Sequence, residues 1–147
     1  MRLTKKSRHR FGKYVRHVAD GMGLRDWSVD LSYPDLVREQ DRAQGHRWCA
    51  MCEPTPGRKA ALIEFSTDWL QRANEYDIRE TVVHELVHCH FGALVDTYRN
   101  DLTDQLSGPV FDVFERNLTR NLEYGVDGIA EEWARHAPMP PTLKFKA

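Results

Sequence analysis

The stretch His84-Glu85-Leu86-Val87-His88 lies near the middle of the chain, and the expected fold follows from it. Residues four apart on an α-helix share one face, with their Cβ atoms about 6 Å apart. Two imidazoles at that spacing can converge on one small cation, and neutral imidazole is a good ligand for Zn²⁺. With a third protein ligand, such an ion keeps one position for water. The spacing therefore predicts a helical zinc site in which Glu85 takes a proton from that water.

The apolar residues around this stretch predict that its helix is largely buried. They recur from about Asp77 to Val95 and cover a wide arc of the helix. Burying a helix that also carries two imidazoles and a carboxylate is costly unless those groups have partners, and a metal ion supplies them. The polar residues 96–108 that follow predict a connection to a second helix.

That second helix is predicted over residues 108–136. Ser107 suits the N-cap position, and Pro109 suits the first turn. Gly125 and Gly128 each cost about 1 kcal/mol relative to Ala inside a helix, so close packing is expected beside them. The predicted apolar stripe consists of Phe111, Phe114, Leu118, Leu122, Val126, Ile129 and Trp133.

The second helix also offers the third ligand. Glu123 and Asp127 lie four residues apart and therefore share a face. Glu123 could complete a two-His, one-Glu zinc site, and Asp127 could accept the ring N–H of one zinc histidine, which fixes its tautomer. Glu131 and Glu132, two turns further along, are the alternative third ligands, although they look more like surface charges.

Together the two motifs resemble the gluzincin arrangement, in which a second helix supplies a glutamate ligand and, four residues later, an acid that supports a zinc histidine. The motif helix followed by Glu123-x-x-Val126-Asp127-x-Ile129-Ala130 is similar to the minimal zincins of phages and bacteria, the ImmA/IrrE-type metallopeptidases. Their second motif has the form E-x-x-A-N-x-F-A, so three positions differ here. The resemblance implies zinc, peptide-bond hydrolysis, Glu85 as general base, and His84, His88 and Glu123 as ligands.

The segments before the motif helix predict strands. Trp27 to Tyr33 alternates apolar and polar residues, which is typical of a half-buried strand. Two more strands are expected over residues 47–53 and 60–66, joined by a hairpin at Pro54-Thr55-Pro56-Gly57. The polar residues 35–46 fit either a loop or a short helix.

This layout predicts one zincin-like α+β domain over residues 1–147, with a small three-stranded sheet that contains the hairpin and is backed by helices. Its expected parts are a basic amphipathic helix (1–22), the strands (27–66), the HExxH helix (77–95) and the long C-terminal helix that carries the third ligand (108–136).

Charge is distributed unevenly along the chain. Residues 1–17 hold seven Lys or Arg and no acid, whereas the remainder holds 14 Lys or Arg against 22 Asp or Glu. The basic face of the first helix is therefore either an ordinary solvated surface or a dock for nucleic acid or an acidic protein partner.

The cysteines invite a second metal hypothesis. Cys49-Ala50-Met51-Cys52 has zinc-knuckle spacing, and His46 precedes it, but a structural zinc site needs four ligands. Cys89 and His90 are the only further candidates nearby, and residues 49 and 52 of one strand would point to opposite faces. The cysteines are therefore interpreted as ordinary strand residues, with Cys89 a small buried residue.

The expected function is that of a zinc-dependent hydrolase, a small metallopeptidase acting on a protein or peptide. Tyr98 is the first choice as donor to the developing oxyanion, with Tyr124 and His90 as alternatives. Two other functions stay open. One is zinc-dependent hydrolysis of a different substrate, and the other is that of a non-catalytic metal-binding module that binds nucleic acid or an acidic protein through its basic N-terminal helix. The sequence has no apolar run near the length of a membrane span and no signal-like h-region, so a cytoplasmic location is expected, that of the host if the gene is a phage's.

Overall fold

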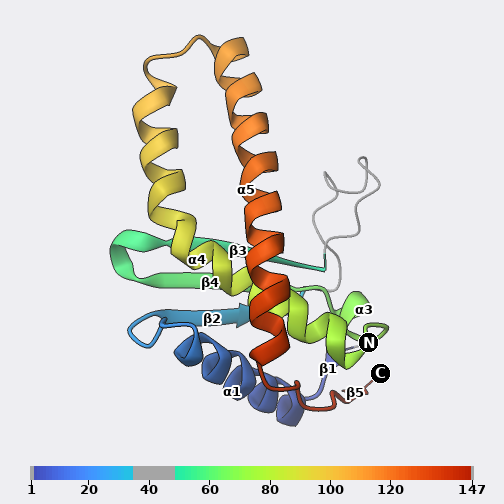
Figure 1. Cartoon of the computed structure of the whole chain (residues 1–147). Coiled ribbons are helices and arrows are strands. Elements are labelled where there is room, and N and C mark those ends of the chain that lie inside the picture. The colour runs from blue at the N-terminus through green and yellow to red at the C-terminus, as the bar shows by residue number, and fades with distance from the viewer. Residues whose placement is uncertain (1, 35–48, 147) are drawn as a thin grey trace.

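Two long helices form an antiparallel hairpin that rises from the rest of the molecule (Figure 1). They are α4 (Glu75–Thr103) and α5 (Gly108–His136), and the computed structural model describes residues 2–34 and 49–146 of the chain. The side chain of Asn74 caps α4 by accepting from the N–H groups of Tyr76 and Asp77. α5 covers the range expected from the sequence.

Helix α4 ends at Thr103 rather than at Val95, so the prediction of a connection over residues 96–108 is largely wrong. The extra turns contact α5 instead of a core. The rings of Tyr98 and Phe114 lie 6.1 Å apart, and Arg99 Nε donates to Glu115 Oε1 at 2.9 Å. Polar residues remain helical here because the neighbouring helix supplies their contacts and because no Gly or Pro interrupts them.

A mixed three-stranded sheet lies beside this hairpin, in the order β2-β4-β3. β2 (Ser28–Ser32) runs parallel to β4 (Ala60–Phe65), and β3 (Ala50–Thr55) runs antiparallel to it. The α+β class and the three strands agree with the sequence prediction. The turn comes later than expected, because Pro54 and Thr55 still belong to β3 and the chain reverses in a 3-10 turn, η1 (Pro56–Arg58).

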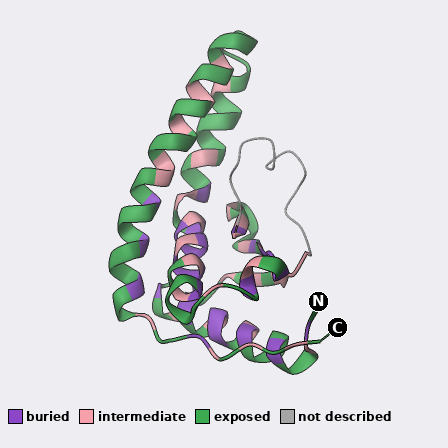
Figure 2. Ribbon diagram, turned by 90° about the vertical axis from the view of Figure 1, so that its right-hand side faces the viewer, coloured by how far each residue is buried: buried purple, intermediate pink, exposed green. Residues whose placement is uncertain are grey.

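Helices α1 and α4 meet the sheet in one apolar core. The first helix, α1 (Lys5–Gly21), is capped by Thr4, and a short helix, α3 (Thr67–Leu70), links the sheet to α4. Figure 2 shows that buried residues concentrate where α1, the sheet and the lower turns of the hairpin meet, whereas the far end of the hairpin is exposed. The largest fully buried side chains include Phe11, Phe65, Leu3, Leu24, Ile63 and Leu86.

The two ends of the chain pair with each other, which the sequence did not predict. β1 (Arg2–Leu3) and β5 (Phe145–Lys146) form a short antiparallel ribbon. The Tyr14 hydroxyl on α1 donates to the Pro138 carbonyl at 2.9 Å, so the C-terminal segment is tied along this helix.

Two expectations about α5 are wrong. A Cβ added at Gly125 or Gly128 would meet nothing within 4 Å, so no close packing explains these glycines. Ile129 and Trp133 are exposed, and the buried positions are Val126, Ala130 and Ala134. Toward the C-terminal end of α5, the buried face is therefore the one that carries Val126, Ala130 and Ala134. The small side chains of the two alanines allow α5 to lie close to the core.

Residues 35–46, expected to be a loop or short helix, lie outside the described residues, as do Arg47 and Trp48 of the second predicted strand. Within residues 2–34 and 49–146, no helix combines the length and the apolar character needed to cross a bilayer.

Candidate metal centre

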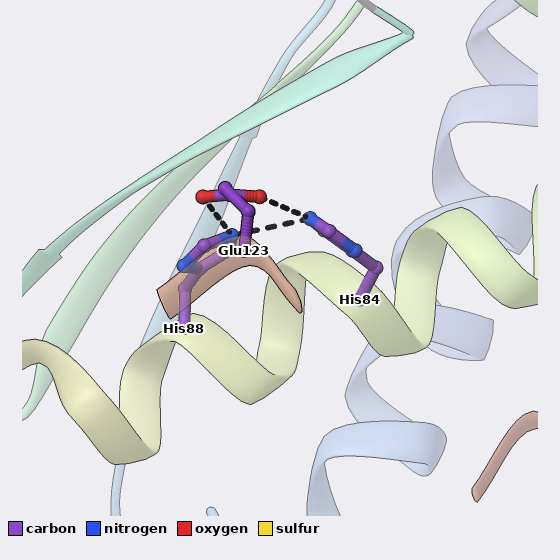
Figure 3. Close-up of side chains that lie close together, drawn as sticks. All are labelled: His84, His88 and Glu123. Carbon is purple, nitrogen blue, oxygen red and sulfur yellow. Dashed lines mark hydrogen bonds and ion pairs between the residues drawn. The ribbon is translucent and has the colours of Figure 1, made fainter. Parts of the chain in front are cut away.

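Three side chains from α4 and α5 converge on one point (Figure 3). His84 and His88 extend from one face of α4, and their Nε2 atoms lie 3.2 Å apart. Glu123 reaches them from α5, with its Oε2 3.3 Å from His84 Nε2 and its Oε1 3.6 Å from His88 Nε2. Within the part of the chain that the structure describes, this is the one group of three or more His, Cys, Asp or Glu residues close enough to hold a metal ion.

These separations fit a tetrahedral ion. Zinc ligands lie about 2.0–2.2 Å from the metal, so two ligand atoms at tetrahedral corners are roughly 3.3 Å apart. The three measured separations are 3.2, 3.3 and 3.6 Å. His84, His88 and Glu123 can therefore occupy three corners of such a site with little movement.

Asp127 holds the other ring nitrogen of His84. Its Oδ1 lies 3.0 Å from His84 Nδ1, one turn along α5 from Glu123. A carboxylate in this place favours a proton on Nδ1, which leaves the Nε2 lone pair directed at His88 and Glu123. Three electron-rich atoms then face one another at short range, an arrangement that only a cation or a shared proton makes favourable.

The pKa shifts of His84 and Glu123 also indicate that positive charge is favourable in this cluster. Burial acts to lower the pKa of His84, but the hydrogen bond with Glu123 and the carboxylates of Glu85, Glu123 and Asp127 outweigh it and raise that pKa overall. The hydrogen bond from His84 lowers the pKa of Glu123. Burial lowers the pKa of His88 and favours a neutral imidazole there. The carboxylates around His84 thus favour positive charge at the position where a metal ion could bind.

Glu85 lies next to His84 in the chain but is buried, with 5% of its surface exposed. Burial raises its pKa to about 7, although the positive charge of His84 and the backbone N–H of Cys52, which donates to this carboxylate, act in the opposite direction. Glu85 can therefore both accept and release a proton near neutral pH, as a general base that later acts as an acid must do.

Strand β3 forms one wall of the site. A cavity of about 840 Å³ lies between β3, α4 and α5. Besides Glu85 and the three candidate ligands, its lining includes Cys49, Cys52, Glu80, Thr81, Asp96 and Arg99. The sequence did not predict that the N–H of Cys52 contacts Glu85. The local sequence pattern of a strand does not show which helix the strand will pack against.

The cysteines do not form a zinc knuckle among the described residues. Cys49 precedes β3 and Cys52 lies within it, and both residues line the cavity. Cys52 Sγ lies 3.9 Å from Sγ of the buried Cys89. The hydrogen bond between them raises the pKa of the Cys52 thiol and lowers that of Cys89. His46 lies outside the described residues.

Other candidates from the sequence lie apart from the ligand cluster. Tyr98 packs beside Phe114 with its ring tilted, is absent from the cavity lining, and lies about 15 Å along the helix axis from His88. Tyr124 and His90 are exposed. Glu131 and Glu132 pair with Arg135 at 2.8 and 3.2 Å on the exposed side of α5. None of these groups is positioned to complete the metal site.

Comparisons with models of known protein families, with curated proteins and with solved structures found no match to this chain. The class of site is therefore defined by its own geometry, which is that of a possible two-histidine, one-carboxylate metal centre.

Proposed function

We propose that this protein is a zinc-dependent hydrolase of the gluzincin type that cleaves peptide bonds. The observation that carries the proposal is the convergence of His84, His88 and Glu123 at tetrahedral ligand separations. The contact of Asp127 with the far nitrogen of His84 adds support, because second contacts of this kind orient metal-bound imidazoles.

The roles of the residues follow from their surroundings. His84 and His88 would each offer Nε2 to the ion, and Glu123 would offer a carboxylate oxygen. Zinc bound there would supply Lewis acidity, polarising a carbonyl and making water more acidic. Glu85 would take the proton of the attacking water on its carboxylate and then give it to the leaving amine, so its pKa of about 7 suits both transfers.

The position of β3 beside the cavity supports an extended peptide as the substrate. Among the described strands, β3 lies at one edge of the sheet, next to β4. Residues 49–54 line the cavity beside Glu85 and the histidines. A peptide laid along this edge would exchange backbone hydrogen bonds with β3, a common mode of peptide recognition.

The first test is the metal content of three purified proteins, namely wild type, Glu123→Ala and Glu131→Ala. We expect about one zinc per chain in the wild type and a loss of that zinc in Glu123→Ala. Glu131→Ala, which removes an exposed glutamate from the same helix, should keep its zinc. A wild-type protein that takes up no added zinc would overturn the proposal.

The second test separates metal binding from hydrolysis. Glu85→Gln should keep its zinc but lose about 10²- to 10⁴-fold in the rate of cleavage of a fluorescently labelled, unfolded protein substrate, because the general base is gone. If the zinc-loaded wild type and Glu85→Gln cleaved that substrate equally well, Glu85 would not be the general base.

A further inference from the structure

The exposed side of α1 is basic along most of its length. Its apolar side is buried in the core through Phe11, Val15 and Val18, and its other side carries no acid before Asp20. Lys6, Arg10 and Lys13 follow one another at intervals of one turn on the solvent side, with His9 and His17 beside them. The helix therefore presents a row of positive charges.

The fold adds charges to this row from the opposite end of the sequence. The β1–β5 ribbon places Arg2 opposite Lys146, and the N–H of Thr4 donates to the Lys144 carbonyl at 3.0 Å. Figure 1 shows both chain ends together beside the first turn of α1. We define the basic surface as the exposed residues Arg2, Lys5, Lys6, Arg10, Lys13, Lys144 and Lys146.

Within residues 2–34 and 49–146, no hydrogen bond or ion pair engages the charged groups of these seven residues. The neighbouring arginines differ, because Arg16 binds Asp20 and two backbone carbonyls and Arg8 lies over the Tyr33 ring. The acids at the border are occupied too, since Asp20 pairs with Arg16 and Glu75 accepts from Thr142. The positive charges of the basic surface are thus not neutralised by other described residues.

We propose that this surface binds the phosphate backbone of duplex nucleic acid, an activity separate from the proposed hydrolysis. A regular row of like charges matches a regular polyanion, which carries one charge per 1.7 Å of duplex axis. α1 is 17 residues long, about 25 Å, and can follow roughly seven base pairs of backbone.

The residue types on the basic surface favour contacts with phosphates rather than with base edges. Binding should therefore not depend on the base sequence. None of the large hydrophobic residues that are exposed belongs to α1, so the helix has no group to stack on bases or to enter a bilayer. Membrane-surface helices bury their apolar face in lipid, whereas the apolar face of α1 is already buried in the protein core.

The test measures fluorescence anisotropy of a labelled 24-base-pair duplex of random sequence, at salt concentrations from 50 to 200 mM. The variant Lys6→Gln/Arg10→Gln/Lys13→Gln removes three charges from the basic surface. The control Arg58→Gln/Arg116→Gln/Arg120→Gln removes three exposed charges elsewhere and changes the net charge equally. Circular dichroism establishes that both variants fold.

We expect wild-type affinity to fall steeply with salt. The basic-surface variant should bind at least about tenfold more weakly at 50 mM salt, with a slope of log K against log salt shallower by roughly 2 to 3, while the control stays within about twofold of wild type. The proposal is overturned by equal losses in both variants, by no duplex binding at 50 mM salt, or by binding of an acidic peptide or of vesicles containing phosphatidylserine without duplex binding. Glu123→Ala should bind duplex like wild type, which separates this result from the fate of the metal centre.

Discussion

At the scale of single residues, Asp127 contacts the ring nitrogen of His84 that does not take part in the candidate ligand cluster. Its carboxylate is 3.0 Å from Nδ1 and belongs to a largely exposed side chain, so its contact with His84 is polar rather than a matter of packing. We expect Asp127→Asn to weaken zinc binding by about 10- to 100-fold, because a neutral amide holds the imidazole less strongly and lowers its basicity.

Competition with a chelator of known zinc affinity measures this change. The matched control is Asp112→Asn, an exposed aspartate of the same helix without a role in the site. If both variants held zinc as tightly as wild type, Asp127 would be a surface acid and nothing more.

Much of the candidate site could be predicted from the sequence because helical geometry is local. The four-residue spacings of His84 with His88 and of Glu123 with Asp127 fix which side chains share a face, whatever the helices contact. What the spacing cannot give is the contact between elements. The N–H of Cys52 meets Glu85 only because β3 packs beside α4, and Tyr98 lies well along α4 from the histidines because this helix continues past the site.

At the scale of elements, Gly92 determines how closely the β3 turn approaches α4. A Cβ at Gly92 would lie 2.9 Å from Pro56 Cγ and 3.0 Å from two atoms of Pro54, and proline rings yield little. We expect Gly92→Ala to lower the free energy of unfolding by about 1–3 kcal/mol, the usual cost of overpacking.

Gly128→Ala on α5 is the matched comparison, because its new Cβ would meet nothing within 4 Å. That variant should gain up to about 1 kcal/mol from the better helix propensity of alanine. Urea unfolding of the two variants and wild type measures the difference. A Gly92→Ala protein as stable as Gly128→Ala would show that the turn can move away at little cost.

The same glycines show where element-level prediction fails. The sequence pointed to Gly125 and Gly128 as sites of close approach, since glycine is unfavourable inside helices, but the close approach occurs at Gly92 on the other long helix. Helix propensity gives the cost of a glycine and not the identity of its neighbour. The β1–β5 ribbon was not predicted either, because a strand of two residues is too short to show an alternating pattern in the sequence.

At the scale of the whole molecule, Tyr14 and Tyr33 link α1 to the rest of the fold. Burial raises the pKa of each to about 12, against partial opposition from Arg79 and Arg8 respectively. The unfolded value is 10, so each neutral phenol contributes stability that is fully present below pH 10 and is lost as pH rises toward 12.

An alkaline titration followed by tyrosinate absorbance tests this expectation. Of the five tyrosines, two should ionise well above pH 10 or together with unfolding, and the free energy of unfolding should fall between pH 10 and 12. Tyr14→Phe should remove one of the two late groups. Ionisation of all five in a single step near pH 10 in the folded protein would contradict it.

The α4–α5 hairpin has a consequence for the order of folding. Helices α4 and α5 can associate contact by contact from the short segment 104–107 that joins them, whereas the parallel strands β2 and β4 have no turn between them from which pairing can start. Contacts near a turn lose little chain entropy when they form, so we expect the two helices to associate and bind zinc before the sheet assembles. In pulsed hydrogen exchange during refolding with zinc, the amides of residues 84–88 should gain protection before those of residues 28–32, and the reverse order would contradict this sequence of events.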